Sequence, residues 1–142
     1  MGVRHRAREA ALRLLYQLEL TGDDTDSALC TYWSELPPKL ANGRTYAEVL
    51  VSTVRSRTDE IDALIDAAAS NWQLSRIARI DLCILRIAVA EMLLSDDAPI
   101  EVVIDEAVEL ARAYSDSEAP AFINGVLDRV ARDRPSQSRK SS

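Results

Sequence analysis

The amino-acid sequence predicts an all-α fold of about seven helices. Apolar residues recur at intervals of three and four along most of the 142-residue chain, which is the period of a helix with one buried face. No segment keeps the apolar-polar alternation of a half-buried strand beside these patterns. The breaks between the periodic segments contain glycine, proline or capping residues, as helix ends commonly do.

The first predicted helix carries the arginine-rich start of the chain. Its apolar stripe consists of Ala7, Ala10, Ala11, Leu14, Leu15 and Leu18. Gly22 suits the left-handed backbone conformation that often closes a helix, and residues 23–27 form a loop that ends at an N-cap. The second helix is short and has an apolar side made of Leu29, Tyr32, Trp33 and Leu36. Pro37-Pro38 ends it, because proline lacks the N–H that a helix needs.

A turn at residues 42–43 precedes the third predicted helix. Thr45 and Glu48 have the spacing of a capping box, in which each side chain accepts a hydrogen bond from a backbone N–H, so the helix is expected to begin there. A break at residues 55–58 separates it from a fourth helix, which is expected to end near Trp72.

The fifth predicted helix is the central one. Residues 77–92 are apolar nearly all round, which is typical of a helix surrounded by others, and Ser75 is placed to cap it. A break at residues 96–99 follows, and its proline suits the first turn of a sixth helix. Asp116 or Ser117 is placed to cap a seventh.

These segments fit one domain over residues 1–132. Trp33, Trp72 and Cys83 are predicted to lie in its core. The polar and basic residues 133–142 are predicted to form a disordered tail.

Several functional classes are disfavoured by what the sequence lacks. No apolar run approaches the roughly 18 residues of a membrane span, and no signal peptide is recognised at the start, so a cytoplasmic protein is expected. The two cysteines are too few for a disulfide framework or a metal site, and the four glycines form no phosphate-binding loop. His5, the single histidine, has no recognisable nucleophile beside it. We therefore expect no cofactor, no metal and no enzymatic activity.

The charge distribution points to a local binding site. A formal net charge of −6 disfavours indiscriminate binding along nucleic acid. The chain's clearest positive patch lies in the first thirteen residues and consists of Arg4, Arg6, Arg8 and Arg13, with His5 beside them and Glu9 as the single acid. Any RNA-binding site is expected there.

Three blocks of residues, in order along the chain, resemble the NusB family from Arg4 to Arg132. Residues 4–17, which begin Arg4-His5-Arg6-Ala7-Arg8-Glu9-Ala10-Ala11, resemble that family's arginine-rich leader and first helix. Residues 77–93 resemble its central helix. The most specific block, residues 98–111 with 122–128, closely follows its C-terminal signature.

The resemblance implies a fold and a role. The implied fold is two small three-helix bundles packed across one another, plus an extra helix. The implied role is transcription antitermination: proteins of this family pair with the ribosomal protein NusE, bind the boxA element of nascent RNA, and help RNA polymerase avoid early termination during ribosomal RNA synthesis.

The resemblance also assigns residues. Arg4, Arg6 and Arg8 take the leader's arginine positions and are predicted to contact RNA phosphates or bases. Phe122 is predicted to stack on an unpaired base. Tyr16 is predicted to help shape the same RNA surface, and Asp81 to pair with a basic residue of NusE.

Three departures from the family pattern bear on these assignments. His5 stands in the RNA-binding leader where arginine is common, and weaker RNA binding is expected from it. Asp105 replaces the usual asparagine, and Glu118-Ala119 replaces Asp-Ser at the border of the RNA surface.

Alternatives remain open at three residues. Phe122 has the helical spacing of an ordinary core residue, with even odds between core and stacking roles. Asp81 is either a partner contact or a surface acid paired near Arg79 or Arg86. Arg86, within an apolar run, is predicted to form a structural salt bridge to an acid such as Glu91 or Glu106.

The alternative functions are an interaction module with no specific RNA binding and an accessory domain for an RNA methyltransferase. A homodimer formed through the RNA-facing surface is a further option.

Overall fold

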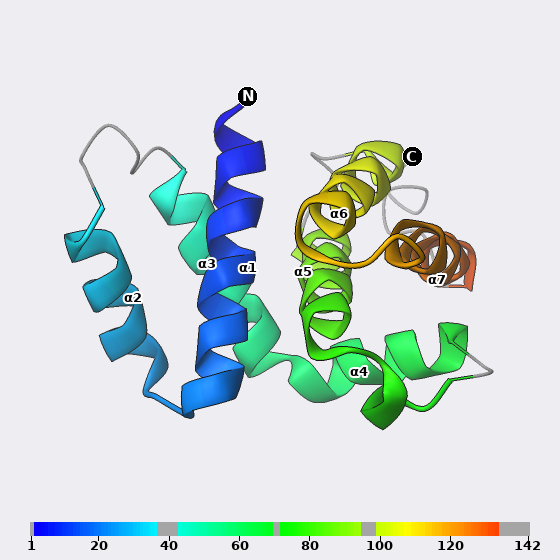
Figure 1. Ribbon diagram of the computed structural model, residues 1–142, viewed down its shortest axis with the longest axis horizontal. Coiled ribbons are helices and arrows are strands. Elements are labelled where there is room, and N and C mark those ends of the chain that lie inside the picture. The colour runs from blue at the N-terminus through cyan, green and yellow to red at the C-terminus, as the bar shows by residue number, and fades with distance from the viewer. Residues whose placement is uncertain (1, 37–42, 70–71, 95–98, 134–142) are drawn as a thin grey trace.

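The structure, a computed structural model, describes residues 2–36, 43–69, 72–94 and 99–133, and this part of the chain contains seven α-helices and no strand (Figure 1). In chain order the helices are α1 (Val3–Thr21), α2 (Thr25–Ser34), α3 (Arg44–Ser56), α4 (Thr58–Ala68), α5 (Arg79–Leu94), α6 (Ile100–Tyr114) and α7 (Ala119–Asp133). A 3₁₀ turn, η2 (Leu74–Arg76), precedes α5. The predicted all-helical class is confirmed.

The helices form two bundles that meet along α5. Helices α1, α2 and α3 pack together on one side, and α5, α6 and α7 pack together on the other (Figure 1). Helix α4 is the extra helix, and it lies beneath the second bundle against α5 and α7. Both α1 and α3 also contact α5, so the nearly all-apolar helix has neighbours on every side, as its sequence predicts.

The core runs through both bundles without interruption. Its largest fully buried side chains come from five helices and include Leu12, Leu14, Leu50, Ile61, Ile84, Leu85, Ile123 and Leu127. Cys83 belongs to this core as expected, whereas Cys30 is exposed. Trp33 is 6% exposed, which confirms its predicted place.

Two predicted helix ends are confirmed by their hydrogen bonds. Gly22 has a φ of 71°, and its N–H donates to the carbonyl oxygen of Leu18 at 2.8 Å, which closes α1. One carboxylate oxygen of Asp116 accepts the N–H groups of Glu118 and Ala119 at 3.0 Å each, so Asp116 rather than Ser117 caps the start of α7.

The predicted capping box at the start of the third helix is wrong. Helix α3 begins at Arg44, one residue earlier, so Thr45 is already inside the helix and makes no cap. Glu48 instead accepts a hydrogen bond from Arg44 Nε at 2.9 Å, one turn away on the same face. The helix starts after Gly43, whose φ of 85° directs the chain close past the backbone of Val3 on α1.

The predicted segment between the fourth and fifth helices also differs. Helix α4 ends at Ala68 rather than near Trp72, and Trp72 is 51% exposed rather than in the core. Ser75 lies within η2 and does not cap α5, which begins at Arg79. The η2 turn lies between α4 and α5, and Trp72 lies at the surface just before this turn.

Some predictions fall outside the described residues: the stop at Pro37-Pro38, Asn42 of the predicted turn, the break at residues 96–98 and the tail from residue 134. No helix in the described part has both the length and the apolar character that crossing a membrane requires.

Candidate nucleic-acid interface

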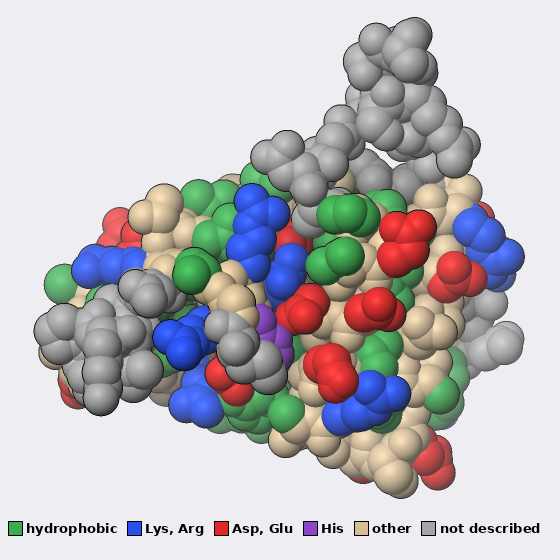
Figure 2. Space-filling view, turned by 90° about the horizontal axis from the view of Figure 1, so that it is seen from above, with side chains coloured by type: hydrophobic (Ala, Val, Ile, Leu, Met, Phe, Trp, Pro, Cys, Tyr) green, Lys and Arg blue, Asp and Glu red, His purple; other side chains and the backbone are tan. Residues whose placement is uncertain are grey.

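The basic leader occupies the first turns of α1, where its four side chains have different environments. Arg4 and Arg6 are exposed, His5 is half-buried, and Arg8 is 5% exposed. The difference follows from the helix, because consecutive residues point about 100° apart. Figure 2 shows basic side chains gathered around the single histidine, with a row of acidic ones beside them. On α6, Asp105 and Glu109 are exposed.

Arg8 is fixed inside the protein by an acid of the central helix. Its Nε and Nη2 donate to the two carboxylate oxygens of Glu91 at 2.8 and 2.6 Å, and Glu91 is 2% exposed. The Tyr46 hydroxyl donates to the same carboxylate at 2.6 Å. Burial lowers the pKa of Arg8, but the hydrogen bonds and charge of Glu91 outweigh this and leave that pKa raised, so Arg8 is charged. The cluster joins α1, α3 and α5.

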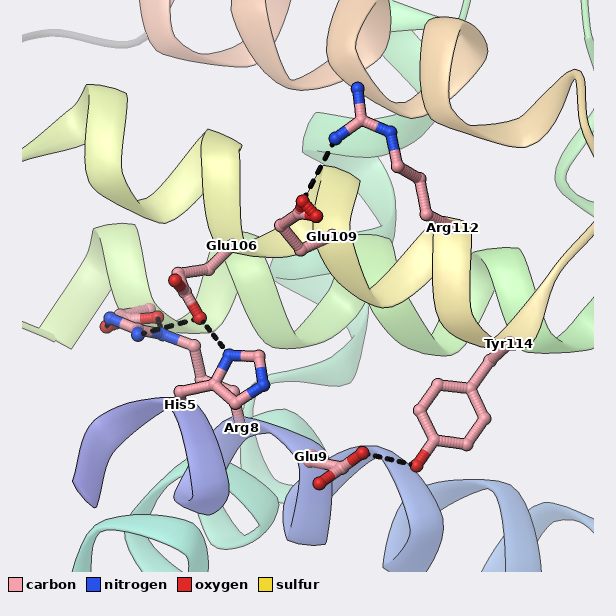
Figure 3. A network of polar contacts seen from close by, with 8 residues as sticks. His5, Arg8, Glu9, Glu106, Glu109, Arg112 and Tyr114 are labelled. Carbon is pink, nitrogen blue, oxygen red and sulfur yellow. Dashed lines mark hydrogen bonds and ion pairs between the residues drawn. The ribbon is translucent and has the colours of Figure 1, made fainter. Parts of the chain in front are cut away.

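Glu106 on α6 links the leader to the second bundle. One of its oxygens lies 2.7 Å from Nδ1 of His5 and 3.5 Å from Nη1 of Arg8, as Figure 3 shows. Arg4 lies over the ring of Tyr46, with its guanidinium carbon 4.7 Å from the ring centre. The leader is thus held against α3 on one side and α6 on the other.

Arg13, the fourth arginine of the predicted patch, belongs to a separate contact near the end of α6. Its Nε and Nη2 donate to the Tyr114 hydroxyl at 3.0 and 2.8 Å. That hydroxyl donates in turn to Glu9 at 2.6 Å (Figure 3). Burial, and then the hydrogen bond to Glu9, raise the pKa of Tyr114, so this hydroxyl keeps its proton at neutral pH.

Tyr16 lies farther along α1 than the leader. It comes eleven positions after His5, which corresponds to roughly 16 Å of helix. Tyr16 lines an open, largely apolar groove of about 430 Å³ between α1, the start of α5 and the end of α6, with Leu12, Ile80 and Tyr114 among its other residues. The structure therefore places Tyr16 with Arg13, which lines the same groove, and not with Arg4, Arg6 and Arg8.

Phe122 and Asp81 line one groove, although they were assigned to different binding roles. The groove has a volume of about 200 Å³ and lies between η2, α5 and the start of α7. Phe122 is half-buried at its edge, with part of the ring packed on the core and part facing outward, and its role in stacking on a base stays a prediction. Trp72 lies across from it, with ring centres 5.9 Å apart and planes at 68°.

Asp81 is largely buried in this groove, with 8% of its surface exposed. It accepts a hydrogen bond from the Ser115 hydroxyl at 2.6 Å, and it forms no ion pair with Arg79 or Arg86. Burial raises the pKa of Asp81, and Ser115 only partly opposes the rise. A carboxylate in this position gains from an added positive partner.

Arg86 has the predicted structural role but with other partners. It donates to both oxygens of Asp62 on α4 at 2.9 Å each and also pairs with Glu19 on α1. The predicted pairing with Glu91 or Glu106 is wrong. Glu91 lies five residues from Arg86, about 140° around the helix, and faces Arg8 instead.

Sequence reasoning missed three contributors to these surfaces. Tyr46 and Glu106 hold the leader, but both read as ordinary helix residues, because the partners they meet are distant in sequence. Trp72 was assigned to the core on its apolar character alone. Within the described residues, no three His, Cys, Asp or Glu side chains are grouped to hold a metal ion.

Comparisons with known proteins agree on one family. The model of the NusB family matches residues 5–132. The chain is 41% identical over 135 residues to the transcription antitermination protein NusB of Geobacter sulfurreducens, covering 95% of this chain and 98% of that one. It is 42% identical over 132 residues to the protein of the same name from Anaeromyxobacter dehalogenans strain 2CP-1, covering 93% and 92%.

Solved structures show the same fold. T. maritima NusB superposes with a TM-score of 0.84 at 30% identity, covering 98% of this chain and 97% of that one. A crystal structure of the antitermination factors NusB and NusE in complex with double-stranded RNA matches with a TM-score of 0.80 at 28% identity, covering 94% and 99%.

Proposed function

This chain belongs to the NusB family, and we propose that it is a transcription antitermination factor that binds boxA-type RNA together with the ribosomal protein NusE, within the RNA polymerase antitermination complex. The proposed role is binding, without a catalytic step. The likeness to a NusB–NusE–RNA structure over nearly the whole chain carries the proposal. The contacts of the leader, and of the groove lined by Trp72, Phe122 and Asp81, support it.

Arg4 and Arg6 are the residues proposed to contact RNA phosphates directly. Both are exposed, and neither forms an ion pair within the described part of the chain. Free guanidinium groups suit phosphate, because their N–H donors match its oxygens in pairs. Acidic side chains border this patch (Figure 2), and Glu106 of α6 contacts His5, so we propose that charge confines RNA to the arginine side.

His5 and Arg8 are proposed to serve the same surface in different ways. His5 is partly exposed and reaches RNA from beside Arg4 and Arg6 while Glu106 holds it. Arg8 has its donors directed at Glu91, so we propose that it positions the leader helix rather than binding phosphate. Its direct RNA contact, as assigned from the resemblance, stays a prediction.

Phe122 and Asp81 are proposed to bring RNA and NusE together. The exposed part of the Phe122 ring offers a surface for a base, and Asp81, in the same groove, offers a carboxylate to a basic residue of NusE. Tyr16 lines the adjoining groove with Ile80, the residue before Asp81. We propose that Tyr16 shapes the NusE end of this surface more than the arginine end.

The test is binding of a short boxA-like RNA and of a scrambled RNA, measured by fluorescence anisotropy with and without NusE. The double variant Arg4→Ala/Arg6→Ala is compared with Arg55→Ala/Arg57→Ala. The second pair lies at the end of α3 remote from the leader, because α3 begins beside Val3 and runs away from it. Both doubles lose the same formal charge.

We expect the native chain to prefer the boxA-like RNA and to bind it more tightly with NusE. The Arg4→Ala/Arg6→Ala variant should lose most of this affinity. Its affinity should also depend less steeply on salt concentration, by the amount expected for the loss of about two phosphate contacts. The α3 double should bind like the native chain. Equal binding to both RNAs would instead favour an interaction module without RNA specificity.

A further inference from the structure

Trp72 is an exposed aromatic residue for which the fold provides no cover. Of the two tryptophans, Trp33 is 6% exposed and Trp72 is 51% exposed. Trp72 stands just before η2 and meets Phe122 of α7 edge to face, with ring centres 5.9 Å apart. A large apolar ring held at the surface by a second ring is a typical feature of a binding surface.

The two rings form two sides of a corner rather than a stack. Their planes meet at 68°, so a flat ligand that stacks on one ring meets the edge or face of the other. The two rings line the groove of about 200 Å³ together with the apolar Ile77, Ala78 and Ala119. This shape fits a planar group inserted from solvent.

Within the described residues, the polar rim of the groove contains one carboxylate and one guanidinium that have no partner. One oxygen of Asp116 is used by the cap of α7, and one of Asp81 by Ser115. The side chains of Glu118 and Arg76 line the groove, are exposed, and make no hydrogen bond or ion pair within the described residues. A carboxylate accepts from an exocyclic amino group of a base, and a guanidinium binds the attached phosphate.

We propose that Trp72 and Phe122 form a pocket for one unpaired nucleobase of the bound RNA, with Glu118 accepting from the base's amino group and Arg76 contacting its phosphate. The pocket selects an amino-bearing base over uracil, whose single N3–H donor is flanked by two carbonyl oxygens that repel the carboxylate. This inference rests on the proposed function, and it adds Trp72, Arg76 and base selection by Glu118 to it.

A basic side chain of NusE is proposed to pair with Asp81, so the question is what occupies the two aromatic rings. The positive charge of Arg76 on the rim disfavours a second cation at the rings. A flat, uncharged base avoids this conflict and uses both rings.

The experiment compares Trp72→Ala and Trp72→Phe with Val49→Ala, each as the full chain with NusE and the boxA-like RNA. Val49 is 41% exposed on α3 and serves as the control for loss of an exposed apolar side chain. We expect Trp72→Ala to weaken RNA binding about tenfold, the usual effect of removing one stacking aromatic residue. Trp72→Phe should recover most of the loss, and Val49→Ala should have no effect.

Base selection is tested with RNAs in which each amino-bearing base is replaced by uracil in turn. In the native chain one replacement should weaken binding more than the others, and in Glu118→Gln that difference should disappear. Tryptophan emission should fall on RNA binding in the native chain and not in Trp72→Phe, because only the exposed tryptophan reaches the base.

Three results would overturn the inference. If Trp72→Ala binds RNA like the native chain, the pocket does not hold a base, although selective, leader-dependent binding would leave the proposed function intact. If Trp72→Ala weakens binding of NusE without RNA, the pocket holds a basic side chain of the partner. If the native chain shows no RNA preference even with NusE, the inference fails with the proposed function.

Discussion

Arg8 and Glu91 form a two-point ion pair inside the protein, although they lie 83 positions apart in the chain. The guanidinium of Arg8 is in the helix that carries the basic leader, and the carboxylate of Glu91 is in the central helix of the fold. Tyr46 completes the pair from α3, and Glu106 approaches Arg8 from α6. The leader end of α1 is therefore oriented by a buried charge, while Arg4 and Arg6 of the same helix face solvent.

Replacing Arg8 is expected to destabilise the fold. Arg8→Met keeps the apolar stem but leaves Glu91 buried without its positive partner, which should lower the free energy of unfolding by about 3–5 kcal/mol. Arg57→Met removes the exposed pair with Glu60 and should change the free energy of unfolding far less, because solvent screens an exposed ion pair. Urea denaturation followed by circular dichroism measures both.

The Arg8→Met variant also tests whether Arg8 positions the leader helix or contacts RNA directly. At temperatures where Arg8→Met is still folded, its RNA affinity should fall much less than that of Arg4→Ala/Arg6→Ala. A variant that unfolds like the native chain but no longer binds RNA would show instead that Arg8 contacts RNA directly.

Tyr46 is expected to ionise late and to make stability depend on pH in the alkaline range. Burial, followed by the hydrogen bond to Glu91, raises the pKa of Tyr46 to about 12, from an unfolded value of about 10. A raised pKa means that the folded state favours the protonated hydroxyl. Its contribution to stability is therefore full below pH 10 and is lost as the pH rises through about 12.

Absorbance titration near 295 nm checks this, with Tyr46→Phe as the reference. The difference between the two curves should have its midpoint near pH 12. Tyr46→Phe should be less stable at pH 8, because it removes one hydrogen bond to a buried carboxylate, and the two proteins should converge in stability towards pH 12. A midpoint near pH 10 would mean that the Tyr46–Glu91 contact is not formed in solution.

Most of the fold follows from local sequence, because helix period and helix ends are local properties. The apolar stripe of α1, the nearly all-apolar α5, the closing Gly22 and the cap at Asp116 depend on residues a few positions apart. The capping box was misleading for the same reason: Thr45 and Glu48 have the required spacing, but Gly43 allows the helix to begin before them.

The site follows less completely, because it depends on distant partners. The sequence groups the leader arginines, but only the contact with Glu91 decides which of them is buried. Trp72 was expected in the core because its side chain is apolar. An apolar side chain indicates a preference for burial, but it does not indicate which neighbours are available to cover it, and Trp72 is exposed. Arg86 was correctly expected to be paired, yet its partners Asp62 and Glu19 come from helices whose packing the local pattern does not specify.

Cys83 is expected to be unreactive in the folded protein. Burial raises the pKa of its thiol to about 12, so almost no thiolate is present at pH 8, and the side chain is enclosed as well. Ellman's reagent should detect one thiol per native chain, that of the exposed Cys30, and two in denaturant. Cys30→Ser should show none until it is unfolded. Rapid reaction of native Cys30→Ser would indicate that the central helix opens readily.

Asp81→Asn is expected to weaken NusE binding without weakening the fold. The raised pKa of Asp81 means that the folded state disfavours its charged form, so the stability it provides below its unfolded pKa is lost as the pH rises through the folded value. An asparagine avoids that cost at pH 7, and its carbonyl oxygen still accepts from Ser115. The melting temperature should be unchanged or higher, while loss of the negative charge should weaken NusE binding at least tenfold by calorimetry.

Asp66→Asn, on the exposed face of α4, is the control and should change neither value. Full NusE affinity in Asp81→Asn would place the partner's basic residue elsewhere, whereas a clear loss of stability would show that Asp81 is needed as a carboxylate within the fold.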